Sequence, residues 1–233
     1  RDLRDRLPSS HRSYSNPLTA YALVVDFDGT ITTEDIGVQI ISRFGLPGWD
    51  RGIEQFRKGE ISSRQLHTSE ARFLKASDLP EMIRFGVDKA IIRPGFRELI
   101  DYCARREIPM EIASSGWDFY VNAILEHEDL GGIPLTTSVV EFDDSERGEW
   151  GLARGSGYCE INGLCKCARV WVQKASGART VFIGDGLSDF CAAAEADVIF
   201  ARRSLARHCA ENGIPFRELT DFFAVIEALK AQS

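Results

Sequence analysis

Residues 21–30 read Tyr-Ala-Leu-Val-Val-Asp-Phe-Asp-Gly-Thr, and this stretch decides the fold that the sequence predicts. Its first five residues are apolar or aromatic and include two β-branched valines, which is typical of a strand buried on both faces. Two carboxylates, Asp26 and Asp28, follow directly. In an α/β sheet, ligands bind just beyond the carboxyl ends of the strands. The stretch therefore predicts a buried strand that carries two acidic side chains into a binding site.

Asp26 and Asp28 would repel each other unless positive charge lay nearby. Mg²⁺ prefers oxygen ligands and is commonly held by one or two carboxylates together with a substrate phosphate. A strand that ends in a polar turn is the plainer alternative, since Asp and Gly are common turn residues. Polar groups further along the chain favour the Mg²⁺ site.

The composition is that of an ordinary globular protein, with 233 residues of which 44% are hydrophobic and 27% charged. A formal net charge of −7 disfavours nucleic acid and anionic membranes as partners, because neither attracts an acidic surface. No apolar run approaches the ~18 residues of a membrane helix, and the N-terminus has no apolar core like that of a signal peptide. Six cysteines without such a signal predict reduced thiols. We expect a cytoplasmic protein, with a homodimer left open as its oligomeric state.

Strands alternate with helices along the chain, which predicts an α/β fold with a doubly wound, parallel, Rossmann-like sheet. Residues 1–20 carry four arginines without apolar periodicity and are interpreted as an N-terminal arm. Residues 34–93 show helical spacing, and we expect a small helical cap inserted after the first strand; residues 21–33 and 94–233 then form the core. Further strands are predicted at 108–113, 133–142, 179–183 and 198–201, and a surface turn or hairpin at 143–157. Further helices are predicted at 96–103, 117–126, 164–174, 190–196, 204–212 and 221–230.

Polar side chains follow three of the predicted strands: Asp26 and Asp28, then Ser114 and Ser115, then Asp185 and Asp189. The carboxyl ends of parallel neighbours meet at one crevice, so we expect these groups to lie together. Lys166 begins a predicted helix and is expected to reach the same place. Carboxylates, hydroxyls and an ammonium group suit an anion with oxygens in several directions, which is a phosphate.

The chain resembles the haloacid dehalogenase superfamily in four segments that follow the family's order: Asp26-Phe27-Asp28-Gly29-Thr30, the strand ending in Ser114, Lys166, and Gly184-Asp185-Gly186-x-x-Asp189. The resemblance covers the chain after residue 20. It is nearest to the phosphoserine phosphatase-like branch, whose members carry a helical cap between the first and second motifs. Residues 95–99 and 114–119 resemble in particular the methionine-salvage phosphatases that act on a keto-enol phosphate, and residues 162–166 resemble phosphocholine and phosphoethanolamine phosphatases.

The resemblance implies a role for each matching residue. Asp26 would attack phosphorus to form an aspartyl-phosphate, and Asp28 would protonate the leaving alcohol and then deprotonate the hydrolytic water. The implied Mg²⁺ ligands are Asp26, the backbone carbonyl of Asp28 and Asp185, with Asp189 either at the metal or orienting Lys166. The implied phosphate-binding residues are Gly29, Thr30, Ser114 and Ser115, with Lys166 offsetting negative charge.

The sequence therefore predicts a Mg²⁺-dependent phosphomonoester hydrolase that acts on a small phosphorylated metabolite. The alternatives are a phosphomutase or phosphotransferase of the same superfamily, and a catalytically silent regulatory homologue. The substrate is not determined: Asp35 stands where phosphoserine phosphatases place a carboxylate for the substrate amine, and reads equally well as a helix N-cap.

Three further groups of residues are interpreted without a catalytic role. The arginines of the predicted cap, Arg51, Arg64 and Arg72, are expected on a solvated face. Cys159, Cys165 and Cys167 favour packed thiols over a zinc site, because no fourth ligand lies close in sequence. All four histidines lie outside the motifs, and the default expectation for them is a surface or core position.

Overall fold

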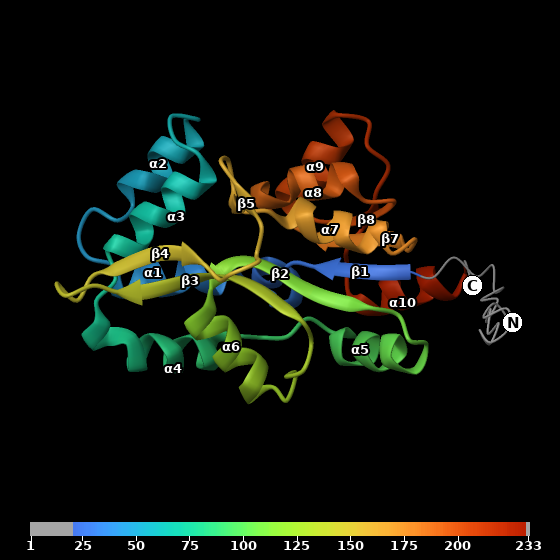
Figure 1. The fold of residues 1–233 in the computed structure, drawn as a ribbon, viewed down its shortest axis with the longest axis horizontal. Helices are drawn as coiled ribbons and strands as arrows, with labels where there is room; N and C mark the ends of the chain where they lie inside the picture. Colours follow the sequence, from blue (N-terminus) through green and yellow to red (C-terminus); the bar gives the residue numbers. More distant parts are fainter. Residues whose placement is uncertain (1–20, 232–233) are drawn as a thin grey trace, which may run out of the picture.

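The centre of the molecule is a seven-stranded sheet, in a computed structural model that describes residues 21–231. The strands follow the order β4-β3-β2-β1-β7-β8-β9, with β1 in the middle (Figure 1). Neighbouring strands are parallel except β3 and β4, which are antiparallel at one edge. The predicted α/β fold is therefore confirmed, while the predicted arm at residues 1–20 lies outside the described residues. The strands are β1 (Tyr21–Val25), β2 (Met110–Trp117), β3 (Leu135–Phe142), β4 (Gly148–Leu152), β7 (Arg179–Gly184), β8 (Val198–Ala201) and β9 (Arg217–Glu218).

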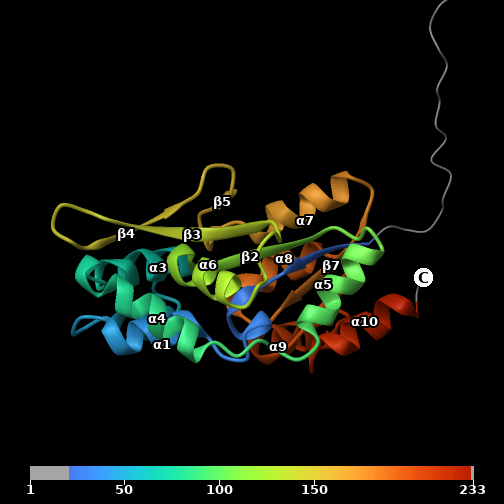
Figure 2. The same ribbon diagram turned by 90° about the horizontal axis from the view of Figure 1, so that it is seen from below.

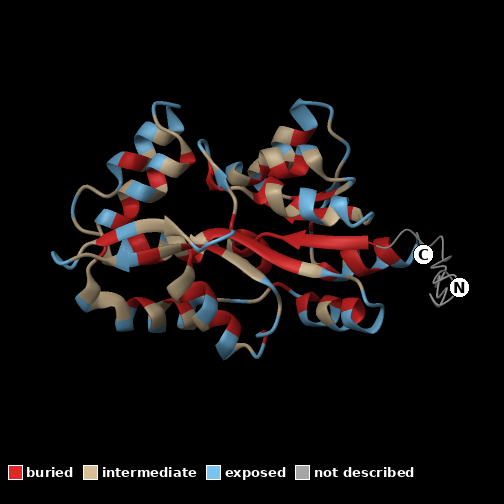
Figure 3. Ribbon diagram, viewed as in Figure 1, coloured by how far each residue is buried: buried red, intermediate tan, exposed pale blue. Residues whose placement is uncertain are grey.

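Helices cover both faces of this sheet, as a doubly wound fold requires. In Figure 1 one face carries α5 (Phe96–Arg105), α6 (Asp118–His127) and α10 (Phe222–Lys230), and the other carries α7 (Lys166–Ala175), α8 (Phe190–Glu195) and α9 (Arg203–Glu211). Leu23 and Val25 belong to the buried cluster on the first face, whereas Val24 belongs to the cluster on the second. The continuous apolar run of β1 is thus explained by burial on both sides, which Figure 3 also shows.

Four helices lie between β1 and α5 in the sequence: α1 (Ile36–Phe44), α2 (Arg51–Arg57), α3 (Ser63–Arg72) and α4 (Leu79–Lys89). Residues 34–93, the predicted helical insertion, are called the cap below; α3 begins with a reciprocal capping box between Ser62 and Gln65. In Figures 1 and 2 the cap helices lie beside the β3–β4 hairpin, and α3 packs on β4.

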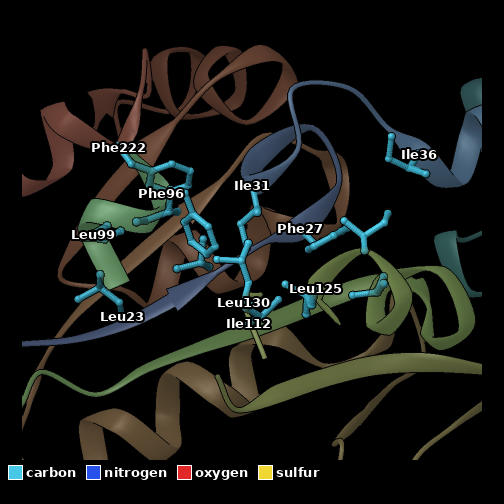
Figure 4. Packing of buried hydrophobic residues seen from close by; sticks show 14 of the residues in the cluster. Leu23, Phe27, Ile31, Ile36, Phe96, Leu99, Ile112, Leu125, Leu130 and Phe222 are labelled. Atoms are coloured by element: carbon cyan, nitrogen blue, oxygen red, sulfur yellow. The ribbon is translucent and has the colours of Figure 1, made fainter. Parts of the chain in front are cut away.

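The cap shares one apolar core with the sheet. Ile36 of α1 belongs to the same buried cluster as Phe27 and Leu125, and all three are labelled in Figure 4. The cluster continues toward the opposite end of β1, where Phe96 of α5 meets Phe222 of α10 with ring centroids 4.9 Å apart. The cap is therefore seated on the core by continuous apolar packing.

Two predicted boundaries are wrong, and three two-residue strands, β5 (Tyr158–Cys159), β6 (Gly163–Leu164) and β9, were missed. β2 continues past Ala113 to Trp117, so Ser114 and Ser115 lie within its buried end instead of in a loop after it; the register against β3 shifts between Ala113 and Trp117. The helix predicted from residue 164 begins at Lys166, because Gly163–Leu164 (β6) pairs with Tyr158–Cys159 (β5). The two-residue strand β9 is too short to show a periodic pattern.

Among residues 21–231, no helix combines the length and the apolar character needed to cross a membrane.

Candidate active site

A cavity of about 350 Å³ lies between the cap and the carboxyl ends of β1, β2 and β7. This volume falls within the range of ~300–1,000 Å³ that is usual for small-molecule sites. The core contributes Asp26, Asp28, Ser114, Ser115 and Asp185 to its lining. The cap contributes Asp35, Val38, Ile53, Phe56, Leu66, His67 and Glu70. The structure therefore brings the residues predicted from separate strand ends to one crevice.

Lys166 lies behind the cavity wall and bridges two carboxylates. Its Nζ donates to Asp26 Oδ1 and to Asp189 Oδ1, each at 2.6 Å, and its side chain has no exposed surface. Burial alone would lower the pKa of Lys166, but Asp189 and Asp26 together raise it, so the ammonium stays charged. Asp26 is held in place by this contact at the end of β1.

Asp189 uses both of its carboxylate oxygens within the protein. Oδ1 accepts from Lys166, and Oδ2 accepts from the backbone N–H groups of Asp185 and Gly186, each at 2.9 Å. Gly184 makes room for this carboxylate, because a Cβ there would collide with it. Asp189 therefore fixes both Lys166 and the turn that carries Asp185.

Asp26, Asp185 and Asp189 place carboxylate oxygens within 4.8 Å of one another. Burial, together with the neighbouring carboxylates, raises the pKa of Asp26 to about 7 and that of Asp185 to about 8. The opposing positive charges, Lys166 beside Asp26 and Arg203 beside Asp185, do not cancel these shifts. Arg203 Nη1 is 3.3 Å from Asp185 Oδ2. Buried, mutually repelling oxygen donors are what a hard cation such as Mg²⁺ requires, so this donor set fits the metal that the sequence predicts.

The turn Phe27–Ile31, directly after Asp26, is held by a buried arginine. Arg93 Nε donates to the carbonyl of Thr30 at 2.7 Å, and Nη2 donates to those of Gly29 at 2.8 Å and Thr32 at 3.1 Å. The Gly29 N–H already points to Glu34 O and Thr32 Oγ1, each at 3.2 Å. Arg93 lies where the chain returns from the cap, so it connects the turn after β1 to both ends of the insertion.

Three hydroxyl groups accompany the carboxylates. Ser114 Oγ accepts from the Gly116 N–H at 3.0 Å, and Ser115 Oγ is buried without a partner while its residue lines the cavity. Thr30 Oγ1 meets no partner with hydrogen-bond geometry, although it lies close enough to Asp26 to lower the pKa of that carboxyl. Thr30 does not line the cavity, whereas the unpartnered hydroxyl of Ser115 belongs to a lining residue and is suited to an incoming ligand with acceptor oxygens.

Asp28 is held at both oxygens by different elements. Oδ1 accepts from the Ile36 N–H at 2.9 Å, and Oδ2 accepts from the Tyr120 hydroxyl at 2.5 Å. Burial, and next the charge of Asp35, raise the pKa of Asp28 well above its usual value, while the Tyr120 hydrogen bond acts against that rise. Tyr120 could not be singled out from the sequence, because it lies in an apolar run of α6 outside every motif.

The cap side of the cavity combines apolar side chains with polar ones, which are Asp35, Arg57, Ser63, His67 and Glu70. Asp35 Oδ1 caps α1 by accepting from the Val38 N–H at 2.8 Å, and Asp35 also lines the cavity. Its position therefore fits both predicted roles, a helix N-cap and a carboxylate that contacts the substrate. His67 Nδ1 lies 3.4 Å from Oε2 of Glu70, and Glu70 is only 6% exposed. His67 and Glu70 were not predicted as site residues. The available signal was an acidic residue on the inward face of α3, one turn after Leu66.

The remaining candidates lie away from this cavity. Arg64 pairs with Glu160, and Arg72 pairs with Asp143 and Glu149. All six cysteines are free thiols. In the part of the chain that the structure describes, the three aspartates are the single His, Cys, Asp or Glu group compact enough to hold a metal, so Cys159, Cys165 and Cys167 do not form such a group.

Known proteins match this chain over most of its length. A model of the haloacid dehalogenase-like hydrolase family matches residues 23–194. The 2-hydroxy-3-keto-5-methylthiopentenyl-1-phosphate phosphatase of Brevibacillus brevis is 32% identical over 209 residues, which covers 89% of this chain and 94% of that protein. The phosphatase of the same name from Geobacillus kaustophilus is 31% identical over 219 residues, with the same coverage.

Among solved structures, a phospho-aspartyl intermediate analogue of phosphoserine phosphatase superposes with a TM-score of 0.68 at 18% identity, covering 90% of this chain and 98% of that one. A substrate-bound phosphoserine phosphatase complex gives a TM-score of 0.67 at the same identity and coverage. At this level of identity the structural likeness concerns the fold.

Proposed function

Because the chain belongs to the haloacid dehalogenase-like hydrolase family, we propose that it is a Mg²⁺-dependent phosphatase of small phosphorylated metabolites that works through an aspartyl-phosphate. The observation that carries the proposal is the position of Asp26, which borders the cavity at the end of β1 and is held by Lys166. The names of the relatives support a phosphatase, and the solved phospho-aspartyl analogue supports a carboxylate nucleophile on this fold.

Asp26 acts as the nucleophile. One of its oxygens forms a bond to phosphorus while the bond from phosphorus to the leaving oxygen breaks. Lys166 keeps the carboxylate oriented and offsets the negative charge that gathers on the phosphoryl group. Ser114, Ser115 and Thr30 donate hydrogen bonds to phosphoryl oxygens. Asp189 holds Lys166 and the turn after β7 in place.

Asp28 moves the protons. Its raised pKa favours the protonated form in the resting site, so it can deliver a proton to the leaving alcohol. The resulting carboxylate then takes a proton from the water that attacks phosphorus, the bond between Asp26 and phosphorus breaks, and phosphate is released. Asp28 thus returns to its starting form after each turnover.

Asp26, Asp185 and the backbone carbonyl of Asp28 would hold Mg²⁺. When bound, the cation supplies positive charge to the phosphoryl oxygens and relieves the repulsion between the two carboxylates.

The cap side of the cavity favours a leaving group with an apolar portion, because Ile53, Phe56 and Leu66 line it. The relatives named for a methylthiopentenyl phosphate indicate one compound of this kind. We therefore take 2-hydroxy-3-keto-5-methylthiopentenyl-1-phosphate as the first substrate to test, beside amino-acid, sugar, nucleotide and amino-alcohol phosphates.

The test is the release of inorganic phosphate from this panel by the purified protein, with and without Mg²⁺. Phosphate release that needs Mg²⁺ and is lost in Asp26→Asn supports the proposal. A folded protein that releases no phosphate from any monoester would refute it. Transfer of the phosphoryl group to a second sugar hydroxyl without free phosphate would instead identify a phosphomutase.

A further inference from the structure

We propose that Tyr120 is a positioning residue that aims Asp28 at the leaving-group oxygen of the substrate. The inference rests on the proposed function, in which Asp28 is the general acid. Tyr120 lies on α6, outside the four motif segments, and the resemblance to known families assigns it no role.

The contact itself is specific. The Tyr120 hydroxyl donates to Asp28 Oδ2 at 2.5 Å, and the Ile36 N–H holds Oδ1 at 2.9 Å. A carboxyl group that is bonded at one oxygen only can still rotate about its terminal torsion, which is broad. With both oxygens held, by α6 on one side and by α1 on the other, the plane of the Asp28 carboxyl is fixed relative to the cavity.

Two glycines create the space that the hydroxyl occupies. A Cβ at Gly116 would collide with both the Tyr120 hydroxyl and Asp28 Oδ2, and a Cβ at Gly37 would come within 2.9 Å of the hydroxyl. Gly116 is in β2 of the core and Gly37 is in α1 of the cap. Backbone from both parts of the molecule therefore leaves room for this one oxygen.

The ring of Tyr120 is fixed as well. It is fully buried and meets Trp117 and Phe119 edge to face, with centroids 6.2 and 5.6 Å away. A phenylalanine would satisfy all of this apolar packing. The Tyr120 hydroxyl is a buried polar group, and such a group needs a hydrogen-bond partner. Its partner in the structure is Asp28, so the contact with Asp28, and not packing, explains why a tyrosine suits this position.

The inference predicts a dependence on the leaving group. An alkyl phosphate releases a strongly basic alkoxide, which needs a well-placed acid, whereas 4-nitrophenyl phosphate releases a stable phenolate that needs little protonation. Loss of the positioning contact should therefore slow formation of the aspartyl-phosphate from the first substrate and spare its formation from the second. The ratio kcat/KM reports this step, whereas hydrolysis of the aspartyl-phosphate, which also uses Asp28, is common to both substrates. A residue that only supports the fold would affect both substrates alike.

The experiment compares Tyr120→Phe with the unaltered protein in the presence of Mg²⁺. We expect kcat/KM for the best alkyl monoester of the panel to fall about 10- to 100-fold, as for partial loss of a general acid. The kcat/KM for 4-nitrophenyl phosphate should stay within about threefold. Tyr102→Phe is the matched control, because Tyr102 is buried on α5 and its hydroxyl has no partner; it should change neither substrate.

Equal losses for both substrates, or no loss for the alkyl ester, would overturn the inference. Two further variants cover the case in which Phe disturbs folding: 4-aminophenylalanine at position 120 keeps a donor and should restore alkyl-ester turnover, while 4-fluorophenylalanine fills the space without a donor and should not. The variant Asp28→Asn distinguishes the general-acid role of Asp28 from the positioning role of Tyr120. If Asp28→Asn fails to discriminate between the substrates, the general-acid assignment falls; if it discriminates and Tyr120→Phe does not, the role of Tyr120 alone falls.

Discussion

The two sides of the cavity differ in how their polar groups are used. On the core side, Asp26, Lys166 and Asp189 form a continuous buried chain of charges. On the cap side, Ile53, Phe56 and Leu66 share the lining with separate polar groups, among them Arg57 and the pair formed by His67 and Glu70. Under the proposed function, the core side carries the reaction, while the cap side contacts the leaving group. Substitutions on the two sides should accordingly have different kinetic effects.

The largest effect is expected on the core side, from Asp26→Asn. The amide keeps the shape of the side chain and can still accept from Lys166, but it is a poor nucleophile. We expect kcat to fall at least ~10⁴-fold, as is usual when a nucleophile is removed. Phosphate release measures this loss, and the circular dichroism spectrum checks that the fold is retained. An Asp26→Asn protein with kcat within tenfold of the original would mean that another group attacks phosphorus.

Lys166→Met tests whether the charges on the core side also support stability. The substitution leaves Asp26 and Asp189 buried without their cation, and breaking a buried pair in this way costs about 3–5 kcal/mol. The matched control is Lys174→Met on the same helix, whose ion pair with Asp197 is 37% exposed on both sides. That substitution should cost at most about 1 kcal/mol.

Urea unfolding of both variants at pH 8 without Mg²⁺ measures the difference in the free energy of unfolding. Equal losses for the two lysines would show that the buried charges are compensated elsewhere.

The two sides also differ in how much of them the sequence could predict. Asp26, Asp28 and Asp185 follow directly after apolar strands, so the local pattern placed them, and the three parallel strands brought them together as expected. Lys166 was expected near them from its place at the start of a predicted helix, and the resemblance to a family implied its role. The cap-side residues have no such signal, because His67 and Glu70 face the cavity only through the packing of α3 against the core.

The same limit applies within the core. Tyr120 reaches Asp28 from a helix 92 residues later in the chain, which no local pattern encodes. The buried end of β2 was placed in a loop, because two serines and a glycine resemble a turn when neither the β3 pairing nor the burial can be seen. Long-range contacts are thus what the sequence pattern failed to supply on both sides.

Mg²⁺ binding should depend on pH, again through the core side. The raised pKa values of Asp26, about 7, and Asp185, about 8, mean that both carboxyls hold protons at pH 6 in the metal-free protein. Because these values exceed those of the unfolded chain, the folded metal-free protein loses stability as the pH rises from about 4 to about 8. Mg²⁺ must displace the same protons, so its affinity should rise at least ~tenfold between pH 6 and pH 8.

Titration calorimetry at the two pH values measures this change, and Asp185→Asn is the control that should remove most of the binding. An affinity that does not change with pH would place the ion away from these carboxyls.

The smallest effect is expected on the cap side, from Phe56→Ala. Phe56 is half-buried and lines the cavity, so truncation removes apolar contact with the leaving group without touching the core side. We expect KM for the best substrate with an apolar chain to rise about fivefold to tenfold, which corresponds to about 1 kcal/mol of lost contact, with kcat nearly unchanged. Methyl phosphate does not reach the cap, so its turnover should be the same in both proteins. Phe223→Ala, at an exposed position on α10, controls for the loss of an aromatic ring elsewhere. A lower kcat for methyl phosphate in Phe56→Ala would contradict the separation of roles between the core side and the cap side. It would show that the cap residues also support the chemical step.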